Sequence, residues 1–296
     1  MSDTPEGTPI ELTHQPRDPS LRLREIQLDG VSLLCTEVEG PGRPVILLHG
    51  FTGHRDDFIH RLPEMVGRAW WLAPDLRGHG DFAKTNRSET FTFDQLVADL
   101  GHLLNRLGAD DCHLLGHSVG GMVALRFALA HPERVQSLIL MSSAPFCPEG
   151  YTRQAFEIAG QVIEQHGMSF LQEALEKSWR EDPDEGGISY TSRWSEIYWP
   201  HHRRRYLAMD PVGYAALGVA MVEQEDLRDR LGEIACPTTV LIGEGDHEFL
   251  DGSKALAGGI PGAVCIDIRD AGHHPHMENP GAWRSALYAH LDRVSR

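Results

Sequence analysis

The sequence has few lysines and no long apolar run. Of its 27 basic residues only Lys84, Lys177 and Lys254 are lysines, and 43 acidic residues leave a formal net charge of −16. A surface of that sign repels phosphate backbones and anionic lipid headgroups, so we expect no nucleic-acid binding. No stretch approaches the roughly 20 apolar residues that a membrane-spanning helix requires. We therefore expect no membrane insertion.

Cysteine is also scarce, and its spacing excludes several kinds of site. No pair shows C-x-x-C spacing among Cys35, Cys112, Cys147, Cys236 and Cys265. An odd number of thiols beside apolar runs fits buried free cysteines in a reducing compartment, and it does not fit a zinc site. The segment 1–20 is polar and proline-bearing, without the basic start and apolar core of a signal peptide. We expect this segment to be disordered and the protein to be cytoplasmic.

Short apolar runs alternate with helical spacing along most of the chain. Two alternating runs around Asp29-Gly30 predict a β-hairpin. The runs PVILLHG, AWWLAPD, DCHLLGHS, VQSLILM and TTVLIG each precede a helix-like segment, the first of them over residues 55–66. Near-continuous apolar strands that alternate with helices predict an α/β fold, with a mostly parallel sheet covered by helices on both faces.

This alternation breaks once, between residues 146 and 231. That stretch has helical spacing, lacks an obvious strand, and holds five of the six tyrosines together with three tryptophans. We interpret 146–231 as a helical lid inserted into one core domain formed by 21–145 and 232–296. An aromatic insertion above a sheet suits a mostly apolar pocket. The alternative is that these rings form the core of the insertion itself.

The stretch LLGHSVGGMVAL places a serine between two glycines, where a strand gives way to a helix. Gly116, Ser118 and Gly120 match the pattern G-x-S-x-G. A strand-to-helix turn this tight strains the central residue and points its hydroxyl away from the sheet, while the flanking positions must lack bulk. The alternative is a serine that only caps the helix. The strand before and the helix after favour a nucleophile.

A serine hydroxyl needs a base to activate it, and histidine is suitable because its pKa lies near neutrality. The loop after the last apolar strand contains DAGHHPHMENP. Gly272 bends the chain there, and His273 lies directly at the strand end. We predict His273 as the base, with His274 as the alternative.

An acid must orient that base, and the end of the preceding strand offers three carboxylates. The stretch TTVLIGEGDHEF contains Glu244, Asp246 and Glu248. Asp246 follows a G-x-x-D pattern that places it on the same edge of the sheet as the serine. We predict Asp246 as the acid, because the order serine, aspartate, histidine is the one expected for this layout.

The remaining parts of the predicted site rest on position alone. Backbone N–H groups of Phe51, in LLHGFTG, and of Val119 are expected to hold an oxyanion. We expect four residues to contact a substrate: His117, Trp194, Tyr198 and Trp199.

Two other clusters have competing interpretations. Adjacent histidines in HHPH diverge in a loop, so we predict no metal, and no cofactor is indicated. The run HHRRRY at 201–206 could bind a substrate carboxylate through an arginine, although such a run is more often a solvated face. We interpret Asp99 and Glu64 as ordinary surface charges, and Arg77 as structural.

From about Leu21 to the C-terminus, LLHGFTG, DLRGHG, GHSVGG, LIGEGD and DAGHHPHMENP resemble the α/β-hydrolase superfamily. The resemblance is to the branch that contains carboxylesterases, enol-lactonases, carbon–carbon bond hydrolases and the menaquinone-pathway synthase with the same triad. It implies this fold and a Ser–Asp–His triad. The family usually has serine where Asp81 stands. The serine at 118 excludes the aspartate-dependent dehalogenases and epoxide hydrolases, and the cysteine-dependent dienelactone hydrolases.

We therefore predict a serine hydrolase that cleaves an ester, thioester or lactone through an acyl-enzyme. The alternatives are a carbon–carbon hydrolase or lyase with the same triad, and a non-catalytic ligand sensor. The predicted partner is a small molecule with a moderately apolar acyl or ring group. The sequence does not indicate an oligomeric state.

Overall fold

An eight-stranded sheet forms the centre of the computed structural model, which describes residues 18–181 and 195–295. Its strand order is β1-β2-β4-β3-β5-β6-β7-β8. The first two pairings, β1 with β2 and β2 with β4, are antiparallel, and the others are parallel. The strands are β1 (Arg22–Leu28), β2 (Val31–Val38), β3 (Pro44–Leu48), β4 (Trp70–Pro74), β5 (Cys112–His117), β6 (Val135–Met141), β7 (Thr238–Gly243) and β8 (Val264–Ile268). The predicted hairpin and the mostly parallel α/β sheet are confirmed.

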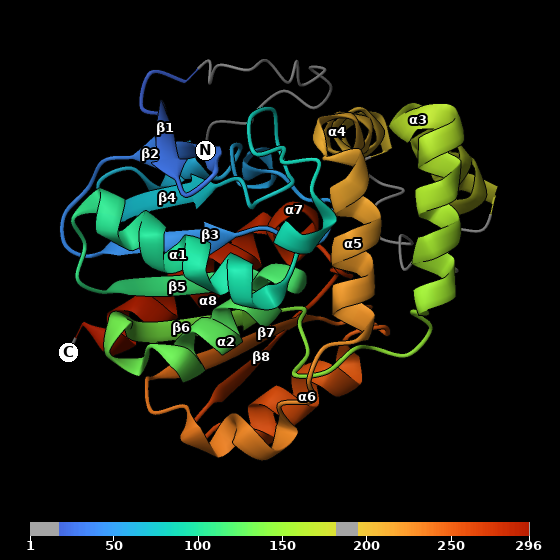
Figure 1. The fold of residues 1–296 in the computed structure, drawn as a ribbon. Coiled ribbons are helices and arrows are strands. Elements are labelled where there is room, and N and C mark those ends of the chain that lie inside the picture. Colours follow the sequence, from blue (N-terminus) through green and yellow to red (C-terminus); the bar gives the residue numbers. More distant parts are fainter. Residues whose placement is uncertain (1–17, 182–194, 296) are drawn as a thin grey trace.

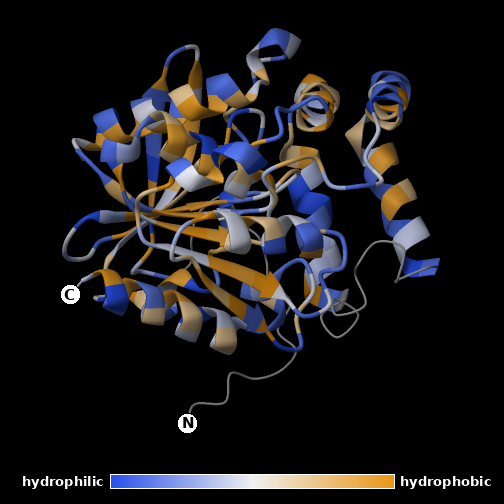
Figure 2. Ribbon diagram, turned by 90° about the horizontal axis from the view of Figure 1, so that it is seen from below, coloured by the Kyte–Doolittle hydropathy of each residue, from blue (hydrophilic) through white to orange (hydrophobic). Residues whose placement is uncertain are grey.

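Helices cover both faces of this sheet, as Figure 1 shows. The core helices are α1 (Phe93–Leu107), α2 (Val119–Ala130), α6 (Leu250–Gly259), α7 (Pro275–Glu278) and α8 (Pro280–Val294). Alternate strand residues supply the two cores, because successive side chains of a strand point to opposite faces. In β3, Ile46 and Leu48 pack with α1 and α2, whereas Val45 and Leu47 pack with α8. Hydropathy colouring shows the resulting apolar centre of the sheet (Figure 2).

The helix predicted over 55–66 is replaced by two short 3₁₀ segments. These are η1 (Arg55–Asp57) and η2 (Leu62–Met65). Pro63 is the second residue of η2, and a proline has no N–H to continue a helical hydrogen-bond ladder from the first segment. The apolar residues of this segment still pack into the core, since Phe58, Leu62 and Met65 are fully buried against one face of the sheet.

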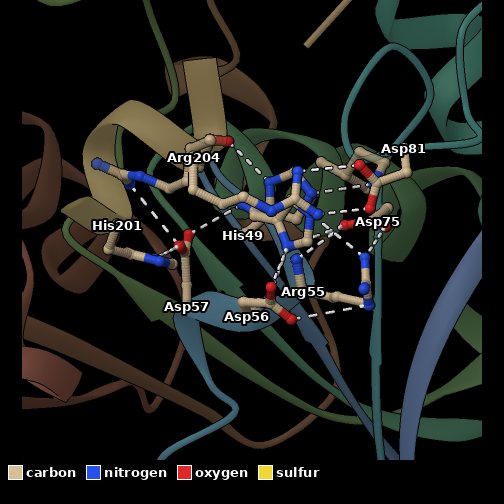
Figure 3. A network of polar contacts seen from close by, with 12 residues as sticks. His49, Arg55, Asp56, Asp57, Asp75, Asp81, His201 and Arg204 are labelled. Carbon is tan, nitrogen blue, oxygen red and sulfur yellow. Dashed lines mark hydrogen bonds and ion pairs between the residues drawn. The ribbon is translucent and has the colours of Figure 1, made fainter. Parts of the chain in front are cut away.

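Among the described residues between β6 and β7, three α-helices lie beyond the carboxyl ends of the parallel strands (Figure 1). We call them the helical insertion: α3 (Arg153–Glu181, with a break at Gly167), α4 (Ser195–Ala208) and α5 (Pro211–Val222). Helix α4 is joined to the core by charged contacts (Figure 3). His201 Nε2 lies 2.6 Å from Asp57 Oδ1, and Arg204 donates two hydrogen bonds to Asp81 at 2.9 and 2.5 Å. Asp81, which departs from the resemblance, therefore pairs with the insertion.

Two interpretations of charged residues need correction. Arg77 donates two hydrogen bonds of 2.7 Å to Asp99, and both side chains are almost completely buried. Asp99 is thus an internal partner of Arg77 and not a surface charge. The run 201–206 is not a solvated face either, because His201, His202 and Arg205 are buried. Both errors arise because the partners come from distant parts of the chain.

In the part of the chain that the structure describes, none of the helices is long and apolar enough to cross a bilayer.

Candidate active site

Ser118 lies at the sharp turn between β5 and α2, as predicted. Its φ and ψ of 52° and −122° fall in a region that residues other than glycine rarely adopt. The turn is held from the core, since the Ser118 N–H donates to the Met141 carbonyl at 2.9 Å and the Ser118 carbonyl accepts from Ser143 Oγ at 2.8 Å. Such strain persists only where the surroundings over-determine the backbone. The turn holds Ser118 at the wall of a cavity of about 190 Å³.

The glycines that flank the serine are required by close backbone contacts. A Cβ on Gly116 would lie 2.3 Å from the Gly120 carbonyl oxygen, and a Cβ on Gly120 would lie 2.4 Å from the His49 carbonyl oxygen. These neighbours are backbone atoms and cannot rotate away. The crowding between strand and helix therefore explains both glycines of the pattern.

Gly116→Ala should therefore lower the free energy of unfolding by about 1–3 kcal/mol, the usual cost of overpacking a dense interior. Urea unfolding followed by circular dichroism measures this. Gly258→Ala, in α6 with open space around its Cα, is the matched control and should be neutral or slightly stabilising. Equal midpoints for the two variants would contradict the packing argument.

Asp246 and His273 come from the loops after β7 and β8 and meet at the same edge of the sheet. His273 Nδ1–H donates to Asp246 Oδ2 at 3.1 Å, and Asp246 is buried. This bond fixes the tautomer and leaves Nε2 available as a base. Phe249 stacks on the His273 ring with centroids 4.6 Å apart. His273 lines the same cavity as Ser118, so the structure brings the three predicted residues together.

The protonation of this pair follows from burial and charge. Burial disfavours the imidazolium, but the Asp246 carboxylate more than offsets this, and the pKa of His273 is raised. Burial likewise favours the neutral form of Asp246, yet the charge and hydrogen bond of His273 hold its pKa below its ordinary value. Asp246 therefore stays ionised beside a histidine of increased basicity.

This arrangement predicts the pH dependence of activity. A general base must be neutral, so kcat/KM for a 4-nitrophenyl ester should rise with pH through the pKa of His273. Because the pKa of His273 is raised above 6.5, the pH at which kcat/KM reaches half of its maximum should be higher than 6.5. A pH–rate profile recorded at the isosbestic wavelength of the nitrophenol measures this. An inflection below pH 6.5 would contradict the assignment.

Two buried side chains hold the backbone around His273. Glu278 Oε2 accepts hydrogen bonds from the N–H groups of Gly272 at 2.6 Å and His274 at 3.2 Å. His117 Nε2–H donates to the His273 carbonyl at 2.7 Å. Burial keeps the pKa of His117 well below its ordinary value, so this ring is neutral. Sequence reasoning missed Glu278, for which an acidic residue five positions after the histidine is the only sequence signal.

The loop after β3 lies against the serine, where oxyanion donors were predicted. His49 Nδ1–H donates to the Gly50 carbonyl at 2.9 Å, and its Nε2 accepts the Leu76 N–H at 3.0 Å. A Cβ on Gly50 would lie 3.0 Å from the Ser118 Cβ, and Phe51 lines the cavity. Val119 begins α2, where the first N–H groups have no acceptor within the helix.

The helical insertion supplies the aromatic wall of the cavity. Of the four predicted pocket residues, His117 and Tyr198 line it. Trp199 does not belong to the lining and packs beside Trp179 and Tyr198 instead. Trp194 lies outside the described residues. The lining includes five rings from these helices and Tyr151 just before α3; the five are Phe156, Trp179, Tyr198, Tyr206 and Tyr214.

Polar side chains also line the cavity, among them Arg205, Glu248 and His274. The HHPH stretch contributes His274, whose ring is tilted against that of His117 with centroids 5.2 Å apart. Across residues 18–181 and 195–295, no group of three or more His, Cys, Asp or Glu side chains is placed to bind a metal ion.

Comparisons with known proteins agree with this layout. A family model described as the alpha/beta hydrolase fold matches residues 43–280. Over 256 residues the chain is 27% identical to a putative 2-succinyl-6-hydroxy-2,4-cyclohexadiene-1-carboxylate synthase of Bacillus subtilis (strain 168), covering 85% of this chain and 92% of that protein. MenH from S. aureus superposes with a TM-score of 0.78 at 23% identity, over 88% of this chain and 99% of that one. A thermophilic esterase from Thermogutta terrifontis superposes with a TM-score of 0.74 at 27% identity, over 92% of this chain and 99% of that one.

The chain therefore belongs to the alpha/beta hydrolase fold family. It is an enzyme of that superfamily, in agreement with the resemblance found in the sequence.

Proposed function

We propose that the protein hydrolyses an ester, thioester or lactone of a small acyl group through an acyl-enzyme on Ser118. The observation that carries this proposal is the strained turn at Ser118, beside a cavity that it shares with His273, whose ring is hydrogen-bonded to Asp246. In the proposed reaction, this strained turn presents the hydroxyl to a bound carbonyl.

In the first half of the reaction, Ser118 Oγ attacks the carbonyl carbon while His273 Nε2 takes the hydroxyl proton. The N–H groups of Phe51 and Val119 stabilise the oxyanion. The intermediate collapses, the bond to the leaving group breaks, and His273 gives its proton to that group. Water then attacks the acyl-enzyme with His273 again as base, which releases the acid and restores Ser118. Asp246 orients the imidazole and stabilises its charge.

The helical insertion is the proposed lid, covering residues 146–231 between the core segments 21–145 and 232–296. Its rings line the cavity that contains Ser118, and any water that they exclude strengthens the electrostatic interactions inside. The cavity of about 190 Å³ is smaller than the pockets of roughly 300–1,000 Å³ that hold drug-sized ligands. A short acyl chain fits this space better than a long one.

A panel of 4-nitrophenyl esters with acyl chains of two to twelve carbons tests this proposal. We expect kcat/KM to be highest for the short chains and to fall as the chain exceeds the cavity. Activity on no ester in the panel, in protein shown to be folded by circular dichroism, would contradict the ester hydrolase assignment.

A carbon–carbon hydrolase or lyase is the second candidate, and one observation favours it. The Bacillus subtilis relative, which matches 85% of this chain, has a name that describes a synthase and not an esterase. In that reaction His273 would act as the acid–base. Product analysis after incubation with β-diketones and simple esters separates the two chemistries.

A further inference from the structure

Arg205 is a buried cation in the wall of the cavity that contains Ser118. It lies on α4, its side chain is 4% exposed, and it lines the cavity together with Ser118 and His273. A guanidinium stays charged at every physiological pH and carries five N–H donors. Burial of such a group is unfavourable unless its donors have acceptors. The role of Arg205 therefore depends on which of its N–H donors have acceptors within the protein.

The protein satisfies the Arg205 guanidinium only in part. It hydrogen-bonds to Tyr198, and its Nη1 lies 3.8 Å from Asp57 Oδ1, which is beyond hydrogen-bond length. Asp57 already accepts hydrogen bonds from His201 at 2.6 Å and from the His54 N–H at 3.2 Å. The Arg205 Nε is buried without an acceptor among the described residues.

Asp57 nonetheless balances the charge of Arg205 and fixes where it lies. Burial alone would raise the pKa of Asp57, but Arg205 and His201 hold it well below its ordinary value, so the carboxylate stays ionised. This carboxylate anchors the guanidinium at the side of the cavity. Arg205 lines the cavity, and a planar carboxylate there could accept from a guanidinium in bidentate form.

We propose that Arg205 binds a carboxylate of the substrate, so that the molecule hydrolysed at Ser118 is an acidic ester, thioester or lactone. The inference rests on the proposed function for the reacting bond. Neighbouring residues that line the same cavity, Tyr198 and His274, restrict the space around the guanidinium. The bound carboxylate would remain intact, because it anchors the substrate while another carbonyl reacts.

Two ester pairs test this, with the carboxylate on either side of the bond that breaks. The first pair is 4-nitrophenyl hydrogen glutarate and its methyl ester. The second is 3-acetoxybenzoate and its methyl ester. For at least one pair we expect kcat/KM of the acid to exceed that of the methyl ester by about 10- to 100-fold, the value of a charge-assisted hydrogen bond. Arg205→Gln should abolish that preference, chiefly through KM, and Arg205→Lys should retain part of it.

Arg203→Gln is the matched control, because Arg203 lies on the same helix, is half-exposed and pairs with Glu176 at 3.0 Å. It should keep the wild-type preference. No preference in the wild-type enzyme, or a preference that survives in Arg205→Gln, would overturn the proposal. If Arg205→Gln lowers kcat/KM equally for the acid and the methyl ester of a pair, Arg205 only holds α4 to the core. If Arg205→Gln does not fold, the wild-type ratio and Arg205→Lys decide.

Calorimetric titration of the Ser118→Ala variant with glutarate and with neutral glutaramide separates this inference from the proposed function. Glutarate should bind at least about tenfold more tightly, and Arg205→Gln in the same background should remove the difference. Arg205-dependent binding without ester turnover would refute the proposed function and leave the anion site. Ester turnover without Arg205-dependent binding or preference would refute the anion site alone.

Discussion

Ser118→Ala is expected to lower kcat on the best ester by about five to six powers of ten. The reason is that the proposed reaction forms a covalent bond to Ser118 Oγ. In the proposed mechanism His273 and Asp246 act by activating that hydroxyl, so they contribute little once it is removed. The residual rate would come from oxyanion stabilisation and substrate binding. Steady-state kinetics at enzyme concentrations high enough to detect slow turnover measures the loss.

Ser285→Ala is the matched control for this variant. Ser285 is exposed on α8, and its Oγ bonds only to the carbonyl of Gly281 one turn earlier in the helix among the described residues. Its substitution should leave kcat unchanged within twofold. Ser118→Ala should also remain folded, because the smaller side chain keeps the backbone bonds that define the turn. A Ser118→Ala enzyme within tenfold of wild type would refute an acyl-enzyme on this residue.

Asp246→Asn should lower kcat by about four powers of ten. An asparagine can present its amide nitrogen to His273 Nδ1, which selects the wrong tautomer and places the proton on Nε2. It also removes the negative charge that raises the pKa of His273 against the effect of burial. The inflection in kcat/KM should therefore move to lower pH than in the wild-type enzyme.

Asp251→Asn, an exposed position in the first turn of α6, is the control for charge removal in the same region. It should change neither kcat nor the inflection. If kcat of Asp246→Asn drops but the pH inflection of its kcat/KM does not move, Asp246 has a packing role. An unchanged kcat would show that another carboxylate orients His273, and Glu248 would be the first to test.

Much of the fold followed from local patterns. The hairpin around Asp29-Gly30 and the parallel strands could be predicted because the spacing of apolar residues and the turn residues are local features of the sequence. The turn at Ser118 was predicted for the same reason, since strand, G-x-S-x-G and helix are contiguous. The structure also places Asp246 and His273 together, because the order of strands brings their loops to one edge of the sheet.

What could not be predicted depends on partners that are distant in the chain. Asp99 was interpreted as a surface charge because Arg77 is 22 residues away, and the burial of Arg205 beside Asp57 requires α4 to be docked. Glu278 contacts backbone N–H groups, which have no sequence signature. The segment 55–66 has helical spacing, but the proline at 63 and the buried polar residues in η1 produce short 3₁₀ turns.

Labelling with a fluorophosphonate, followed by intact mass and peptide mapping, tests the central claim most directly. We expect one adduct per chain, located on Ser118, absent from Ser118→Ala and formed much more slowly in Asp246→Asn. An adduct on a different residue, or no adduct on folded wild-type protein, would contradict it.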